Sequence, residues 1–189
     1  MFIRICFIIC VFSLTACSSS GPGPKVQYYL LDTASDRSLT TDGASQLAEV
    51  RVGAVPDYLN QNALIMMVSE HTLEIARYHK WADRLTDSIA RVVEYEYNQA
   101  LIVSEADSAC EQCRSIVLFI EHFYPTADGD VFLTGFYQYN NDQSAPIKKR
   151  FNLQGRIQGD GYKAAVVEMR QLLVELSAHI AQEQGITQS

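Results

Sequence analysis

Two cysteines, Cys110 and Cys113, stand in a Cys-Glu-Gln-Cys sequence, a spacing that serves thiol redox chemistry or metal binding in many proteins. A redox pair usually follows a strand and begins a helix, because the helix N-terminus lowers the pKa of the attacking thiol. Here the pair precedes a predicted strand over 116–124, and the acidic residues Glu105 and Glu111 lie close by and raise the pKa of a thiol. The sequence therefore favours a structural disulfide between Cys110 and Cys113 over free thiols, a redox site or a metal site.

No other residues form a recognisable catalytic or metal-binding pattern. The chain contains no Gly-x-Ser-x-Gly, no His-Glu-x-x-His and no phosphate-binding glycine loop. Its four histidines are scattered, and His122 lies on an apolar run, which is more typical of a core or edge residue than of a ligand. His71 and His79 could meet in space, but their spacing does not show it. We therefore predict no enzyme, no metal site and no non-covalent cofactor.

A third cysteine, Cys17, ends an N-terminal segment of a different kind. Arg4 precedes an apolar run over 5–14, which makes about 15 Å of helix, whereas the hydrocarbon core of a membrane is about 30 Å thick. A short apolar run that ends in small residues is typical of a secretion signal. The order Leu14-Thr15-Ala16-Cys17 resembles the lipobox of bacterial lipoproteins, in which the thiol receives a diacylglycerol. We predict a signal peptide over 1–16 and lipid attachment at Cys17, the alternative being ordinary secretion with a chance cysteine.

The residues after Cys17 bear on where the anchor is inserted. Lipoproteins retained at the inner membrane usually carry an aspartate after the cysteine, whereas Ser18 and Ser19 follow here. This resemblance implies the inner leaflet of the outer membrane, with the protein facing the periplasm. Residues 17–25 are the lipidated cysteine and a polar, Ser-, Gly- and Pro-containing tether, and residues 26–189 are long enough for one domain.

Charge excludes one class of partner. The chain carries 22 acidic and 15 Lys and Arg residues, for a net charge of −7. Its concentrated positive patch, Lys148-Lys149-Arg150, lies in an alternating pattern and indicates the solvent face of a strand. We therefore expect no nucleic-acid partner.

Periodicity predicts the elements that position these residues. Apolar runs predict strands over 26–31, 49–55, 64–68, 72–76, 116–124, 131–139 and 147–157, with a hairpin turn at Asp128-Gly129. Apolar residues spaced three and four apart predict helices over 81–101 and 162–182. For the second helix we predict Asp160 as the N-cap and Gly185 as the residue that ends it. A short strand is predicted at Ile102-Val103, after the first helix. This order indicates an α+β fold in two layers, a mostly antiparallel sheet with two main helices packed on one face.

Two segments read Val-Arg-Val-Gly-Ala-Val-Pro-Asp-Tyr-Leu at 50–59 and Tyr-His-Lys-Trp-Ala-Asp-Arg-Leu at 78–85. They resemble the PqiC (YmbA) lipoproteins, the auxiliary lipoprotein family of ABC-type and MCE-type transport systems. Members carry Pro-x-Tyr-Leu after an early strand and His-x-Trp-Ala at the start of the first helix. The resemblance covers the mature chain in order and spacing, and it departs at Arg84, where many members have a proline that fits the first helical turn.

The resemblance implies a non-enzymatic outer-membrane lipoprotein that works with an MCE-domain (PqiB-like) protein and forms a homo-oligomer. Such systems move lipids between the two membranes and support envelope integrity, and the lipoprotein would dock their periplasmic tunnel to the outer membrane. The alternative is an adaptor or assembly lipoprotein of another envelope complex. The candidate partner contacts are Pro56, Tyr58, Leu59 and Trp81, since aromatic residues are enriched at interface hot spots. Trp81 also fits a core aromatic that seats the helix on the sheet.

Overall fold

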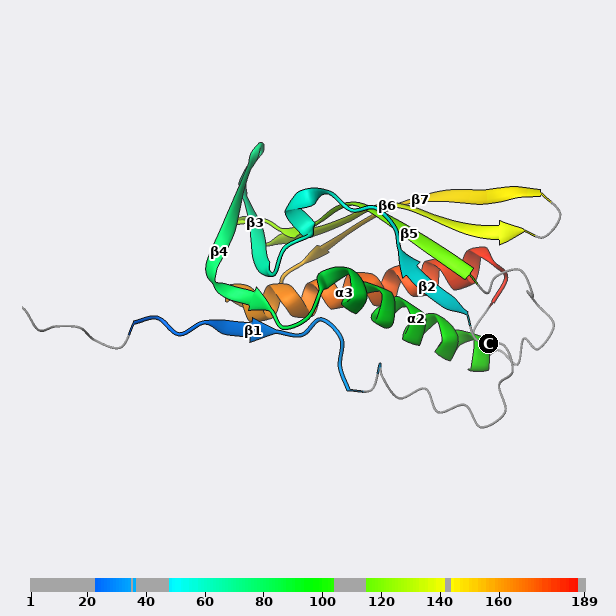
Figure 1. Cartoon of the computed structure of the whole chain (residues 1–189), viewed down its shortest axis with the longest axis horizontal. Helices are drawn as coiled ribbons and strands as arrows, with labels where there is room; N and C mark the ends of the chain where they lie inside the picture. The colour runs from blue at the N-terminus through cyan, green and yellow to red at the C-terminus, as the bar shows by residue number, and fades with distance from the viewer. Residues whose placement is uncertain (1–22, 35, 37–47, 104–114, 142–143, 187–189) are drawn as a thin grey trace, which may run out of the picture.

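A computed structural model gives the fold of the chain and describes residues 23–34, 36, 48–103, 115–141 and 144–186 (Figure 1). The predicted signal peptide, Cys17, and the Cys110 and Cys113 pair lie outside the described residues, as does most of the predicted loop over 34–46. The predictions made for them therefore stay predictions.

Within the described ranges the chain forms seven strands, one short 3-10 turn and two long helices. The strands are β1 (Gln27–Tyr29), β2 (Glu49–Val52), β3 (Ala63–Ser69), β4 (Thr72–Trp81), β5 (Ser115–Pro125), β6 (Asp130–Asn141) and β7 (Ser144–Arg156). The turn is η2 (Asp57–Leu59), and the helices are α2 (Leu85–Val103) and α3 (Gly161–Glu183).

The strands form two sheets, whereas we predicted one. The larger sheet has the order β2-β5-β6-β7 and the smaller one the order β1-β4-β3. The pairs β1–β4 and β2–β5 are parallel and the other three pairs are antiparallel. The sheets meet at a bridge between Met67 and Thr126, beside which the Ala127 N–H donates to the Met67 carbonyl at 2.8 Å. Apolar alternation shows which residues face the core but not which strand lies alongside, so the pattern could not separate the two sheets.

Helices α2 and α3 lie side by side against one face of the larger sheet (Figure 1). On the strands this face carries fully buried residues such as Leu118, Leu133 and Tyr137. The helices pack against this face with the predicted apolar residues spaced three and four apart. These buried residues are Ile89, Val92, Val93 and Tyr97 on α2, and Met169, Leu172, Leu173, Leu176 and Ile180 on α3. The predicted α+β class, with both helices on one face, is confirmed.

The boundary between β4 and α2 differs from the prediction. We predicted a helix from Trp81, but β4 continues to that residue, whose N–H donates to the Asn62 carbonyl at 2.7 Å. The helix begins only at Leu85, and the Arg84 carbonyl accepts the Ser88 N–H at 3.1 Å. Arg84 therefore precedes the helix instead of lying in its first turn. The predicted strand at Ile102-Val103 is also wrong, because both residues end α2.

The predicted turns are largely confirmed. Gly129 has φ +88° at the β5–β6 hairpin, and Gly185 has φ +79° just after α3, a backbone region that glycine adopts without strain. Asp160 occupies the N-cap position of α3, but its side chain makes no capping hydrogen bond.

Candidate functional site

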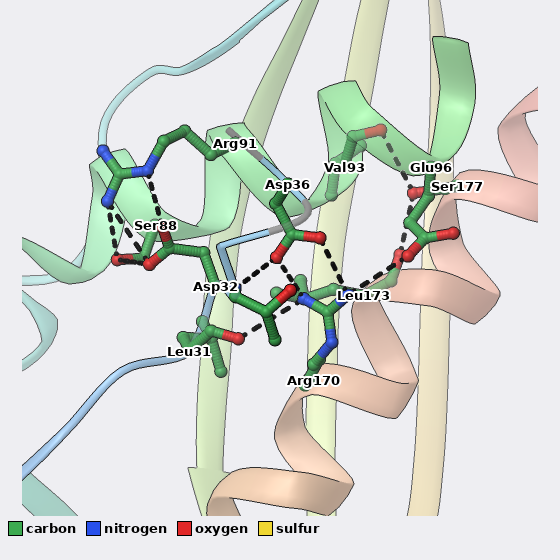
Figure 2. Close-up of polar contacts among 11 residues, drawn as sticks. Leu31, Asp32, Asp36, Ser88, Arg91, Val93, Glu96, Arg170, Leu173 and Ser177 are labelled. Atoms are coloured by element: carbon green, nitrogen blue, oxygen red, sulfur yellow. Dashed lines mark hydrogen bonds and ion pairs between the residues drawn. The ribbon is translucent and has the colours of Figure 1, made fainter. Parts of the chain in front are cut away.

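The segment that follows β1 is tied to both helices by buried carboxylates (Figure 2). The carboxylate of Asp36, with no exposed side-chain surface, accepts two hydrogen bonds from the guanidinium of Arg170 on α3, at 2.7 and 3.0 Å. Arg170 also lies 3.2 Å from Glu96 on α2 and donates to the Leu31 carbonyl at 3.4 Å. Such two-pronged pairing fixes direction as well as distance. Burial raises the pKa of Glu96, Arg170 opposes that rise, and Asp36 adds to it.

A second buried carboxylate, Asp32, pairs with the N-terminal part of α2. Its oxygens accept from Arg91 Nε at 3.0 Å and from Ser88 Oγ at 3.1 Å. Arg91 also reaches Asp83 at 2.6 Å, and the backbone N–H of Arg84, followed by the Arg91 guanidinium, lowers the pKa of Asp83. We call Asp32, Asp36, Ser88, Arg91 and Arg170 the clamp. It holds the start of the domain, just after the tether, against α2 and α3.

The candidate contact residues gather at the η2 turn. Leu59 and Trp81, 3% and 6% exposed, line one apolar cavity together with Tyr58. The cavity has a volume of about 10 Å³, which is about the space of one water molecule. Leu59 and Trp81 thus lie in the core, and the cavity is too small for a lipid chain.

The hydroxyl of Tyr58 reaches the face of the larger sheet that is opposite to α2 and α3. Its hydroxyl donates to the Glu121 carbonyl at 2.9 Å and lies 3.0 Å from Nδ1 of His122. A hydroxyl has one proton, so if Tyr58 donates to the carbonyl, Nδ1 of His122 carries the proton of the second bond. Burial, and then the neighbouring Tyr124, raise the pKa of Tyr58 to about 12. Tyr58 is therefore a fixed, neutral side chain at neutral pH.

An aromatic row continues from Tyr58 across this face. The ring centroids of Tyr58 and Tyr124 are 6.3 Å apart, those of His122 and Tyr124 5.6 Å, and those of Tyr124 and Phe132 6.4 Å. His122 itself is exposed, at the rim of the row. A partner that reaches the η2 turn meets half-buried Pro56 and Tyr58 and exposed His122 before it meets Leu59 or Trp81.

The structure therefore brings Tyr58, Leu59 and Trp81 together and places Pro56 just before their turn. Sequence reasoning missed the clamp entirely. A signal was present, because Asp32 follows the apolar residues Leu30 and Leu31 directly, where burial of a carboxylate calls for a cationic partner. It also missed His122 as a partner of Tyr58, since the two are 64 residues apart in the sequence.

Two classes of site are not found in the described part of the chain. None of its His, Cys, Asp and Glu residues form a group of three or more that could hold a metal ion. None of its helices is both long and apolar enough to cross a membrane.

Comparison with known proteins places this geometry in a family. The model of the ABC-type transport auxiliary lipoprotein component matches residues 28–181, from β1 to the end region of α3. The chain belongs to this family. The match includes the clamp, the η2 turn and Trp81.

Curated relatives and a solved structure agree with that assignment. The chain is 27% identical over 174 residues to the intermembrane transport lipoprotein PqiC of Escherichia coli K12, covering 90% of this chain and 91% of the relative. The same figures hold for PqiC of Shigella flexneri. A crystal structure of an uncharacterized protein matches with a TM-score of 0.69 and 26% identity, over 85% of this chain and 99% of that one. The fold and the family resemblance are thereby confirmed.

Proposed function

We propose that the protein is a non-enzymatic outer-membrane lipoprotein of an intermembrane lipid transport system. In this proposal Cys17 carries the lipid, the domain faces the periplasm, and a homo-oligomer docks the tunnel of an MCE-domain (PqiB-like) protein to the outer membrane. The observation that carries the proposal is the family match over 28–181, on a chain that begins with a lipobox-like segment. Its relatives named PqiC are called intermembrane transport lipoproteins.

The clamp supports an anchoring role. A lipid on Cys17 would act on the domain through residues 18–25, which lead into β1. Because Asp32 and Asp36 bind both helices directly after β1, a force on the tether that separates β1 from its sheet would then be borne by the ion pairs to α2 and α3. A tethered docking subunit requires such a connection.

The η2 turn supports a docking role. It combines an aromatic side chain, Tyr58, held by two polar partners, with Leu59 and Trp81 packed beneath it. Interface hot spots are enriched in tyrosine and are held rigid by their surroundings. We propose that Pro56 and Tyr58 contact the MCE-domain protein, with Leu59 and Trp81 supporting them from the core.

Native mass spectrometry of the intact protein, gently extracted from outer membranes, tests the proposal. The expected result is an acylated oligomer that carries an MCE-domain protein. An acylated monomer with a different envelope protein would favour the alternative, an adaptor or assembly lipoprotein of another complex. Cys17→Ser is the matched control for the anchor, and we expect it to abolish the acyl mass and outer-membrane fractionation. Normal fractionation of that variant would contradict lipid attachment at Cys17.

A further inference from the structure

Strand β1 and the residues that flank it expose several apolar side chains. Tyr29 is half-buried and Leu31 is buried, so these positions face the domain. The alternate positions Val26, Tyr28 and Leu30 are 43%, 65% and 55% exposed. A strand with one solvated face normally carries polar residues there, and adjacent exposed apolar side chains mark a contact surface. We call Val26, Tyr28 and Leu30 the β1 ridge.

The surroundings of the ridge match a lipid headgroup region. Tyr28 pairs with Lys80 of β4, so the Lys80 side chain leaves the sheet on the same face, and Lys25 directly precedes the ridge. Tyrosine and apolar side chains flanked by lysines are typical of membrane interfaces, where the aromatic ring sits among headgroups and lysine reaches phosphate oxygens. The chain as a whole is acidic, with a net charge of −7, so anionic lipids would repel most of its surface.

The ridge lies within reach of the proposed anchor. Residues 18–25 separate Cys17 from Val26, and a chain of that length spans at most about 30 Å when fully extended. A tether of this length allows β1 to reach the membrane surface.

A second copy of the chain is a weaker candidate for this surface. β1 is an edge strand of the smaller sheet but has only three residues, so it offers few backbone hydrogen bonds to another strand. Lysines beside the ridge also favour phosphate groups over an identical basic patch.

We propose that the β1 ridge inserts into the headgroup region of the membrane that holds the anchor and fixes the orientation of the domain. This inference rests on the proposed lipid at Cys17. In Figure 1 β1 lies along one margin of the molecule and β6 and β7 along the opposite margin. Docked through β1, the domain presents the larger sheet away from the lipid, where a partner can reach it.

Tryptophan fluorescence of the full, lipidated protein tests this contact. The probe is Tyr28→Trp, reconstituted in vesicles of phosphatidylethanolamine and phosphatidylglycerol that carry bromine on the upper acyl carbons. The chain has one native tryptophan, Trp81, which is buried, so the parent protein gives the background to subtract. We expect the emission of the probe to shift to shorter wavelength and to be quenched by the brominated lipid.

A matched pair of charge substitutions identifies the surface. Leu30→Glu in the probe background places a carboxylate on the ridge, and we expect it to lower the ratio of docked to undocked domain roughly tenfold. Val167→Glu introduces the same carboxylate at a similarly exposed apolar residue on α3, 62% exposed against 55%, and we expect quenching to be retained.

The other outcomes overturn the inference. Absence of quenching, in protein that mass spectrometry shows to be acylated and that floats with the vesicles, would refute the lipid contact and leave the proposed function intact. Protein without the acyl mass would refute the anchor and with it the inference. A shift to shorter wavelength that rises with protein concentration in detergent alone would assign the ridge to contact between copies.

Discussion

The two sheets of this domain differ in what covers them. The larger sheet has one face covered by α2 and α3, with residues such as Leu118 and Leu133 fully buried. Eight large apolar residues are exposed in the described ranges. Five of them belong to the smaller sheet or flank its strand β1, namely Val26, Tyr28, Leu30, Val68 and Ile75. The difference indicates that the smaller sheet, although it contributes core residues such as Leu64 and Trp81, also leaves apolar side chains available for contacts with other molecules.

Trp81 joins the two regions, and its loss should have the largest effect. It belongs to β4 of the smaller sheet, but it lines the η2 cavity with Phe123 of the larger sheet and Met169 of α3. We expect Trp81→Ala to lower the free energy of unfolding by about 3–5 kcal/mol, because a large buried ring is removed. Urea denaturation followed by circular dichroism measures this. Unchanged stability with loss of the MCE-domain partner would instead make Trp81 a contact residue.

The clamp should be the next most sensitive region. In Asp36→Ala the guanidinium of Arg170 loses its two-pronged partner, and we expect the free energy of unfolding to fall by about 2–3 kcal/mol. This is below the full effect for a buried pair, because 24% of the Arg170 side chain is exposed. The same denaturation assay measures the loss.

Two further variants sharpen that result. Asp36→Ala combined with Arg170→Met should recover part of the loss, because the guanidinium that lost Asp36 is removed as well, while Glu96 loses its contact with Arg170. Glu49→Ala removes the partner of Arg51 in an exposed pair, and we expect a much smaller loss of stability than for Asp36→Ala. Equal losses for Asp36→Ala and Glu49→Ala would show that the clamp is no stronger than a surface pair.

Local patterns predicted the parts of this fold that depend on neighbours in the sequence. The stripes of α2 and α3, the β5–β7 meander and the turn at Gly129 follow from spacing and turn chemistry within a few residues. The division into two sheets does not, because β1 pairs with β4 and β2 with β5 across long stretches of chain. The predicted boundary between β4 and α2 was wrong for a related reason, since the backbone hydrogen bond from Trp81 to Asn62 joins residues 19 positions apart.

The candidate site was predictable only in part for the same reason. Asp32 and Arg91 are 59 residues apart, and Asp36 and Arg170 are 134 apart, so no local spacing indicates their pairing. The grouping of Pro56, Tyr58, Leu59 and Trp81 came from the family resemblance, and packing explains why three of them occur together.

Substitution of Tyr58 should have the smallest effect, and it tests how firmly the η2 turn is held against the outer face of the larger sheet. Its pKa is raised from 10.0 to about 12, so the folded state favours the neutral phenol. The resulting stability is fully present below about pH 10 and is lost as the pH rises toward 12. Tyr58→Phe cannot ionise, and we expect its stability to decline less over this window than that of the parent protein.

The measurement is the difference in unfolding free energy between the parent protein and Tyr58→Phe at each pH. Burial also raises the pKa of Tyr97 and Tyr137, but both residues remain in the variant, so their contribution cancels in the difference. At neutral pH Tyr58→Phe should cost only about 1 kcal/mol, since it loses the bonds to Glu121 and His122 but keeps the ring packing. Parallel stability curves from pH 10 to 12 would show that Tyr58 ionises freely and that the turn is looser than the core it covers. Converging curves would show that the turn is held as firmly as the sheet beneath it, as a preformed contact surface requires.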